Sequence, residues 1–144
     1  IATWQNNSEI VKLLLDKDPS IKHIGLQDGK SRKGYSALMW AIHNSNIEIV
    51  KLLLNIPNHF FEQINIKTVN DSNALIIASL KGNIGVVTEL LDNKYWTNKD
   101  EERLEYIKQG DNSKTTPLMW AAISGESEIV EYLFFSPSSH KPRR

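Results

Sequence analysis

The segment Asn7-Ser-Glu-Ile-Val-Lys-Leu-Leu-Leu-Asp16 returns almost unchanged as Asn46-Ile-Glu-Ile-Val-Lys-Leu-Leu-Leu-Asn55. Weaker copies follow as Asn83-Ile-Gly-Val-Val-Thr-Glu-Leu-Leu-Asp92 and Glu126-Ser-Glu-Ile-Val-Glu-Tyr-Leu-Phe-Phe135. The equivalent positions Ile10, Ile49, Val86 and Ile129 are spaced by 39, 37 and 43 residues. Repeats of about 20 to 50 residues indicate a solenoid, in which each unit stacks on its neighbours. The sequence therefore predicts a stack of units.

A second element precedes each of the three later copies: Ser36-Ala-Leu-Met-Trp-Ala-Ile42, Asn73-Ala-Leu-Ile-Ile-Ala-Ser79 and Thr116-Pro-Leu-Met-Trp-Ala-Ala122. Each begins with a residue that favours a helix N-cap, and Pro117 favours the first helical position. An alanine recurs inside each element, as expected where two helices approach closely. The tryptophans Trp40 and Trp120 recur as well, and we expect them to pack in the core between units. Two short helices per unit make the chain all-α.

The last unit resembles the ankyrin repeat. Thr116-Pro-Leu-Met-Trp-Ala-Ala-Ile-Ser-Gly125 is similar to the Thr-Pro-Leu-His-x-Ala signature of that family, and the resemblance extends over about 2–135. It implies an ankyrin-type helix-turn-helix solenoid. Met39, Ile76 and Met119 stand where the family often has histidine, so we expect loops that are less tightly bonded to the helices.

These units are longer than the family repeat of about 33 residues. We expect an array over 1–135, with a partial repeat at 1–30, repeats at 31–67, 68–110 and 111–135, and a loose tail at 136–144. The extra residues fall after each second helix, in 16–33, 55–71 and 92–114, and lengthen the loops between repeats. Within 97–110 the pattern predicts one additional short helix, with Thr97 as its capping residue. The first unit begins in mid-helix, so we expect a larger protein with further repeats before Ile1.

Composition excludes several classes of partner and location. Seventeen basic residues balance seventeen acidic ones, which argues against a partner recruited by net charge, such as nucleic acid. No apolar run approaches the roughly 20 residues of a membrane-spanning helix. The chain has no cysteine, which excludes disulfides and thiolate metal sites and favours an intracellular, cytoplasmic location.

Signals for catalysis are weak, and we expect no enzyme activity, metal, cofactor or small-molecule substrate. Gly29-Lys-Ser31 lacks the glycine and the strand-to-helix context of a phosphate-binding loop. The four histidines lack metal-site spacing, and His43 is expected to be a contact residue. The acidic run from Asp100 to Glu105 is expected to be a solvated helix face, since acidic residues favour a helix N-terminus.

The ankyrin resemblance implies a concave groove formed by loop tips and first helices, which would bind a partner protein or peptide. Tyr35 and Arg32 lead the candidates, because aromatic and arginine side chains dominate interface energetics. The positions that the resemblance assigns to partner binding are Trp4, Arg32, Lys33, Tyr35, His43, Asn44, Asn70, Ser72, Leu80, Lys81, Asn112, Ser113, Thr115 and Ile123. Exposed Trp4, Leu80 and Ile123 would form an apolar strip across units.

Protein–protein interaction is therefore the leading hypothesis. Two alternatives stay open: a substrate-recruiting arm of an enzyme whose catalytic domain lies outside this chain, and a structural spacer with an inert concave face. The abundance of Asn, Lys and Ile suggests an AT-rich genome, which adds the hypothesis of an effector directed to a host cytoplasm. Fold alone does not decide among them.

Overall fold

The computed structural model describes residues 7–17, 27 and 33–135. The helices are α1 (Ser8–Lys17), α2 (Ala37–His43), α3 (Ile47–Leu54), α4 (Phe60–Asn65), α5 (Ala74–Lys81), α6 (Ile84–Leu91), the 3₁₀ helix η1 (Lys94–Trp96), α7 (Asp100–Lys108), α8 (Pro117–Ile123) and α9 (Ser127–Phe135). In this part of the chain, the one β-type pairing is an isolated bridge between Gln27 and Ser36. The prediction of an all-α solenoid is confirmed.

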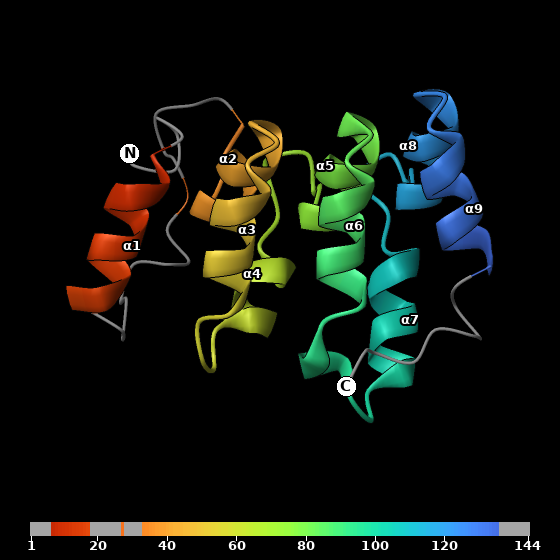
Figure 1. The fold of residues 1–144 in the computed structure, drawn as a ribbon. Helices are drawn as coiled ribbons and strands as arrows, with labels where there is room; N and C mark the ends of the chain where they lie inside the picture. Colours follow the sequence, from red (N-terminus) through yellow and green to blue (C-terminus); the bar gives the residue numbers. More distant parts are fainter. Residues whose placement is uncertain (1–6, 18–26, 28–32, 136–144) are drawn as a thin grey trace.

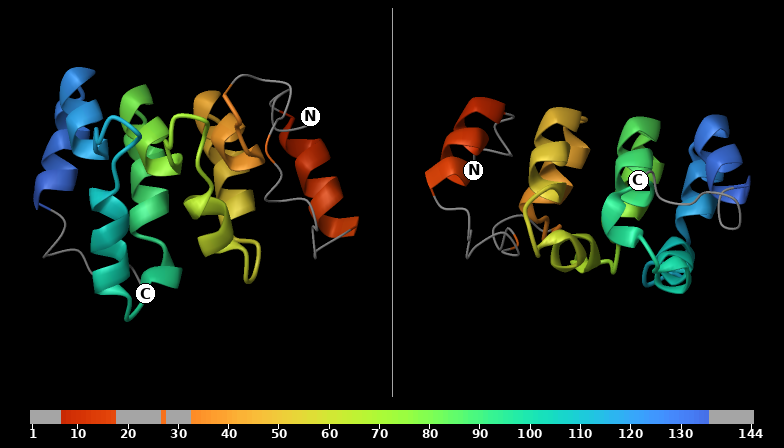
Figure 2. Two further views of the ribbon diagram at one scale, coloured as in Figure 1. Left: turned by 180° about the vertical axis from the view of Figure 1, so that it is seen from behind. Right: turned by 60° about the horizontal axis from the view of Figure 1, so that its bottom comes forward.

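The helices form two rows that run along the stack (Figures 1 and 2). One row contains α1, α3, α6 and α9, and the other contains α2, α5 and α8. Each helix contacts the equivalent helix of the next unit, and α2, α5 and α8 each pack on the second helix of their own unit. The recurring alanines Ala41, Ala78 and Ala121 are fully buried where these helices meet.

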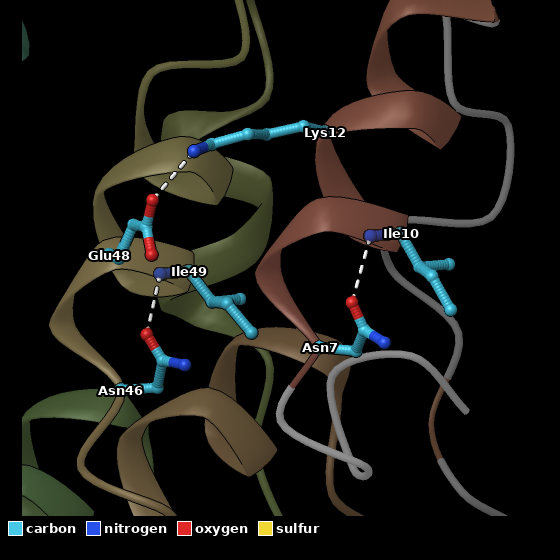
Figure 3. Close-up of polar contacts among 6 residues, drawn as sticks. All are labelled: Asn7, Ile10, Lys12, Asn46, Glu48 and Ile49. Carbon is cyan, nitrogen blue, oxygen red and sulfur yellow. Dashed lines mark hydrogen bonds and ion pairs between the residues drawn. The ribbon is translucent and has the colours of Figure 1, made fainter.

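The repeated sequence sets the helix starts in both rows. In α2, α5 and α8 the side chains of Ser36, Asn73 and Thr116 accept hydrogen bonds from the backbone N–H three residues later, as predicted. In the other row Asn7 and Asn46 do the same for Ile10 and Ile49, each at 3.0 Å (Figure 3). These bonds satisfy N–H groups that the helix itself leaves without a partner.

An ion pair joins α1 and α3, the first two helices of the row that also contains α6 and α9. Lys12 Nζ lies 2.7 Å from Glu48 Oε1, between α1 and α3 (Figure 3). Both side chains are exposed, so the pair contributes little to stability. Burial of Val11 and Val50 in the shared core supplies the stronger attraction between these helices.

The inserted segments differ from the sequence prediction. Residues 55–71 were expected to be loop, but they contain α4, whose Phe60 and Ile64 face the core one helical turn apart. The additional helix predicted in 97–110 is present as α7. Thr97 does not cap it; its hydroxyl instead donates to the carbonyl of Lys94, the first residue of η1. The insertions after α3 and α6 thus contain helices of their own, and these form an extra layer at the lower ends of the repeated helices in Figure 1 (see also Figure 2).

Buried polar side chains attach this layer to the repeats. Gln63 Nε2 donates to the Leu53 carbonyl at the end of α3 at 2.6 Å. Trp96 Nε1 donates to the Leu90 carbonyl at 2.7 Å, and Arg103 donates to the Leu91 carbonyl at 3.4 Å, both at the end of α6. The last carbonyls of a helix have no partner within it. The inserted segments therefore also serve as C-terminal caps for the second helices.

Candidate functional site

A cavity of about 470 Å³ lies among the loop tips and first helices of three successive units. We call it the loop-tip cavity. It is lined by Lys33, Tyr35, Thr68, Asn70, Ser72, Ile76, Ile77, Leu80, Asp111, Asn112, Ser113 and Trp120. Half of the candidate positions from the sequence lie on this lining: Lys33, Tyr35, Asn70, Ser72, Leu80, Asn112 and Ser113.

The other candidates lie outside that lining. His43 packs edge-on against Tyr35 and Trp40, with ring centroids 5.8 and 5.6 Å apart. Ile123, at the end of α8, is 69% exposed. Asn44, Lys81 and Thr115 are at least partly exposed, and Trp4 and Arg32 lie outside the described residues.

Two loop residues that the sequence reading missed shape the cavity. Thr68 Oγ1 accepts hydrogen bonds from the backbone N–H groups of Asn70 and Ser72. In the next unit Asp111 Oδ1 accepts from those of Ser113 and Thr115, at 2.9 and 3.0 Å. The signal was present in the sequence, since a short polar residue stands at the same loop position in both units.

The loops are tied to each other although the family's histidine is absent. The Val69 N–H donates to the Lys33 carbonyl at 3.2 Å, and the Asn112 N–H donates to the Asn70 carbonyl at 3.1 Å. Backbone bonds thus run from loop to loop across the units. Hydrogen bonds between the backbones of successive loops thus hold the loops together, and the prediction of less tightly bonded loops did not include these bonds.

The recurring tryptophans do not lie in the buried core, so that prediction was wrong. Trp40 and Trp120 are half-buried and belong to the face of the first helices. Trp120 lines the loop-tip cavity, and its indole N–H donates to Asp111 Oδ2 at 2.9 Å. Trp40 packs against Tyr35, with centroids 5.1 Å apart. The indole hydrogen bond explains the placement of Trp120, because a tryptophan that reaches a polar partner can remain at a surface.

Two aromatic side chains beside the cavity, His43 and Tyr35, have shifted pKa values. Burial lowers the pKa of His43, and the nearby ammonium groups of Lys81 and Lys33 lower it further. Burial raises the pKa of Tyr35. Lys33 Nζ lies 5.6 Å from the Tyr35 ring centroid, so positive charge and aromatic surface adjoin at this side.

We expect Asp111 to make the stability of the fold depend on pH. Burial opposes its ionisation, but hydrogen bonds from Trp120, Thr115 and Ser113 outweigh that effect and hold its pKa below the usual 3.8. The ionised carboxylate therefore stabilises the fold above pH 3.8, and this contribution is lost as the pH falls through the lower folded-state pKa. The midpoint of thermal unfolding should fall less steeply in acid for Asp111→Asn than for the parent. Identical acid profiles would contradict this role.

Within the described ranges, no three His, Asp or Glu side chains are grouped to hold a metal ion. In the same part of the chain, no helix is long and apolar enough to cross a membrane.

Two rows of short helices with repeated loop tips define a helical-repeat solenoid protein. The family model described as "Ankyrin repeats (3 copies)" matches residues 1–101 and 58–143. The chain belongs to the ankyrin repeat family. Ankyrin repeats are generally protein–protein interaction modules and are typically non-catalytic. Comparison with curated proteins gives no significant match.

Proposed function

We propose that this chain binds an extended segment of a partner protein in the loop-tip cavity. The observation that carries the proposal is the composition of the lining, which combines an apolar floor with polar loop tips from three successive units. Ligand sites typically pair such apolar surface with a few placed polar groups.

The floor would hold an apolar side chain of the partner. The apolar floor consists of Ile76, Ile77 and Leu80. Ile77 is almost fully buried, whereas Leu80 is 43% exposed and is available to a ligand. Tyr35 and Trp120, both half-buried, stand in the neighbouring units and would enclose the same side chain. Aromatic side chains contribute large contact areas with little loss of conformational entropy.

The loop tips would bind the partner's backbone. Asn70, Asn112 and Ser113 are exposed and carry side chains that both donate and accept hydrogen bonds. The bonds from loop to loop hold these tips in place before binding, which reduces the entropy cost of association. Lys33 lines the cavity, and Lys81 follows Leu80 at the end of α5. Their positive charges favour an acidic residue beside the apolar anchor.

Peptide display on the folded chain tests this proposal. Peptides selected on the parent should carry an apolar residue next to an acidic one. Leu80→Asp should weaken their binding by at least about tenfold, or roughly 1.4 kcal/mol, because it places a charge on the floor. The control is Leu13→Asp, which makes the same change at a 56% exposed leucine of α1 outside the cavity. Equal binding by the parent and Leu80→Asp would remove the loop-tip cavity as the binding surface.

A further inference from the structure

A second cavity, of about 560 Å³, lies between the inserted helices α4 and α7. We call it the α4–α7 groove. It has no lining residue in common with the loop-tip cavity. Its lining comes from α4, η1 and α7, which form the extra layer at the lower ends of the repeated helices in Figure 1. Any ligand in this groove would therefore contact the inserted segments rather than the repeated units.

Acidic and aromatic side chains combine in this groove. Glu101, Glu102 and Glu105 line it and are exposed, while Lys99 is the basic residue of the lining. Phe61 is half-buried and contributes aromatic surface. The lining thus carries a formal excess of negative charge beside an aromatic ring.

The position of Lys99 shows what the groove can accept. Its ammonium lies 5.4 Å from the Phe61 ring centroid and 4.0 Å from Glu102 Oε1. A cation over an aromatic face and beside a carboxylate makes two favourable contacts at once. Because Lys99 remains partly exposed, its pair with Glu102 is weak, and an incoming cation can compete for the same surface.

Helix formation alone does not account for the acidic residues. Asp100, Glu101 and Glu102 occupy the first turn of α7, where negative charge favours the helix N-terminus. Glu105 lies beyond that turn and is three and four residues after Glu102 and Glu101. Like charges at this spacing destabilise a helix. A bound cation would relieve this repulsion.

The aromatic side of the groove is formed in advance. The ring centroid of Trp96 lies 5.1 Å from that of Phe61 and 5.7 Å from that of Tyr106. Trp96 and Tyr106 are each only 2% exposed, so their packing fixes the position of the Phe61 ring. A preformed surface loses little entropy on binding.

We propose that the α4–α7 groove binds a basic peptide segment, with an arginine or lysine over Phe61 and further basic residues facing the glutamates of α7. Arginine suits the site best, because its planar guanidinium stacks on aromatic rings and pairs with carboxylates through two hydrogen bonds. This surface is independent of the loop-tip cavity, where the lysines favour acidic residues. One array would thus hold two segments of opposite charge.

Fluorescence anisotropy with two labelled peptides tests the proposal at physiological ionic strength. The two peptides have equal length and the same leucine positions. They differ only in that one carries arginine at each position where the other carries glutamate. The arginine peptide should bind the parent, and the glutamate peptide should not. Glu101→Gln with Glu105→Gln should weaken the arginine peptide at least about tenfold. Phe61→Leu should weaken it by about two- to fivefold, the value of an exposed cation–π contact.

A matched control separates this site from general charge attraction. Glu128→Gln with Glu131→Gln changes the net charge equally at exposed positions of α9, away from the groove, and should leave binding within about twofold. Circular dichroism establishes that each variant is folded. Failure of the arginine peptide to bind, or an equal loss in both double variants, would overturn the proposal. Leu80→Asp should leave this binding intact, so failure here is distinguishable from failure at the loop-tip cavity.

Discussion

Replacing Trp96 with alanine should lower the free energy of unfolding by about 3 to 5 kcal/mol, the usual cost of truncating a large buried aromatic residue. Trp96 is only 2% exposed, and its ring packs against Phe60, Phe61 and Tyr106 at centroid distances of 5.1 to 5.7 Å. The variant would leave a cavity between α4, η1 and α7. It would also leave the Leu90 carbonyl without the indole donor that caps α6.

Urea unfolding followed by far-ultraviolet circular dichroism measures this loss without relying on tryptophan fluorescence. Trp96→Phe keeps a ring but removes the indole N–H, so it should cost only about 1 to 3 kcal/mol from the unsatisfied carbonyl and the smaller side chain. Trp120→Ala serves as a comparison, because that side chain is half-buried and should cost less than Trp96→Ala. A loss below about 1 kcal/mol for Trp96→Ala would mean that the inserted helices rest loosely on the array.

The difference between Trp96 and Trp120 also shows where the sequence was informative. The position of each repeated helix follows from local signals, since Ser36, Asn73 and Thr116 cap their helices and the apolar pattern recurs. Trp120 also repeats, at the position of Trp40, but repetition indicates an equivalent position and not its depth of burial.

The inserted layer depended on contacts that no repeat predicts. Helix α4 has only six residues, and Phe60, Gln63 and Ile64 become informative only once the end of α3 and the ring of Trp96 lie beside them. A helix this short is unstable alone and takes its stability from packing. The α4–α7 groove was hidden for the same reason: its acidic residues were visible in the sequence, but the Phe61 ring that faces them comes from a distant insertion.

The alignment of the repeats predicted only some of the residues that form the loop-tip cavity. Lys33, Tyr35 and Leu80 were predicted because equivalent positions of an ankyrin array face the partner. Thr68 and Asp111 were not, since their contribution is to bond the loop backbone rather than to contact a ligand. Alignment therefore identified exposed positions, but not the residues that hold them in place.

Replacing Asn73 with alanine should cost about 2 kcal/mol, more than the same change at the other caps of this row. Its side chain accepts from the Ile76 N–H at 3.0 Å and donates to Gln109 Oε1 at 3.2 Å. Asn73 is fully buried and Ile76 is 2% exposed, so water cannot replace the lost acceptor. The bond to Gln109 also joins the start of α5 to the residue that ends α7, which couples this cap to the inserted layer.

Thr116→Ala provides the matched control, because Thr116 caps α8 through Met119, and Met119 is 52% exposed. Water can bond that N–H in the variant, so the loss should be about 1 kcal/mol or less. Asn73→Ser keeps a cap acceptor but is too short to reach Gln109, and it should recover most of the stability lost in Asn73→Ala. Equal losses in Asn73→Ala and Thr116→Ala, measured by urea unfolding, would show that burial does not set the strength of the cap. A larger loss in Asn73→Ala would mean that identical positions in the repeat carry different energies, because neighbouring units and the inserted layer bury them to different depths.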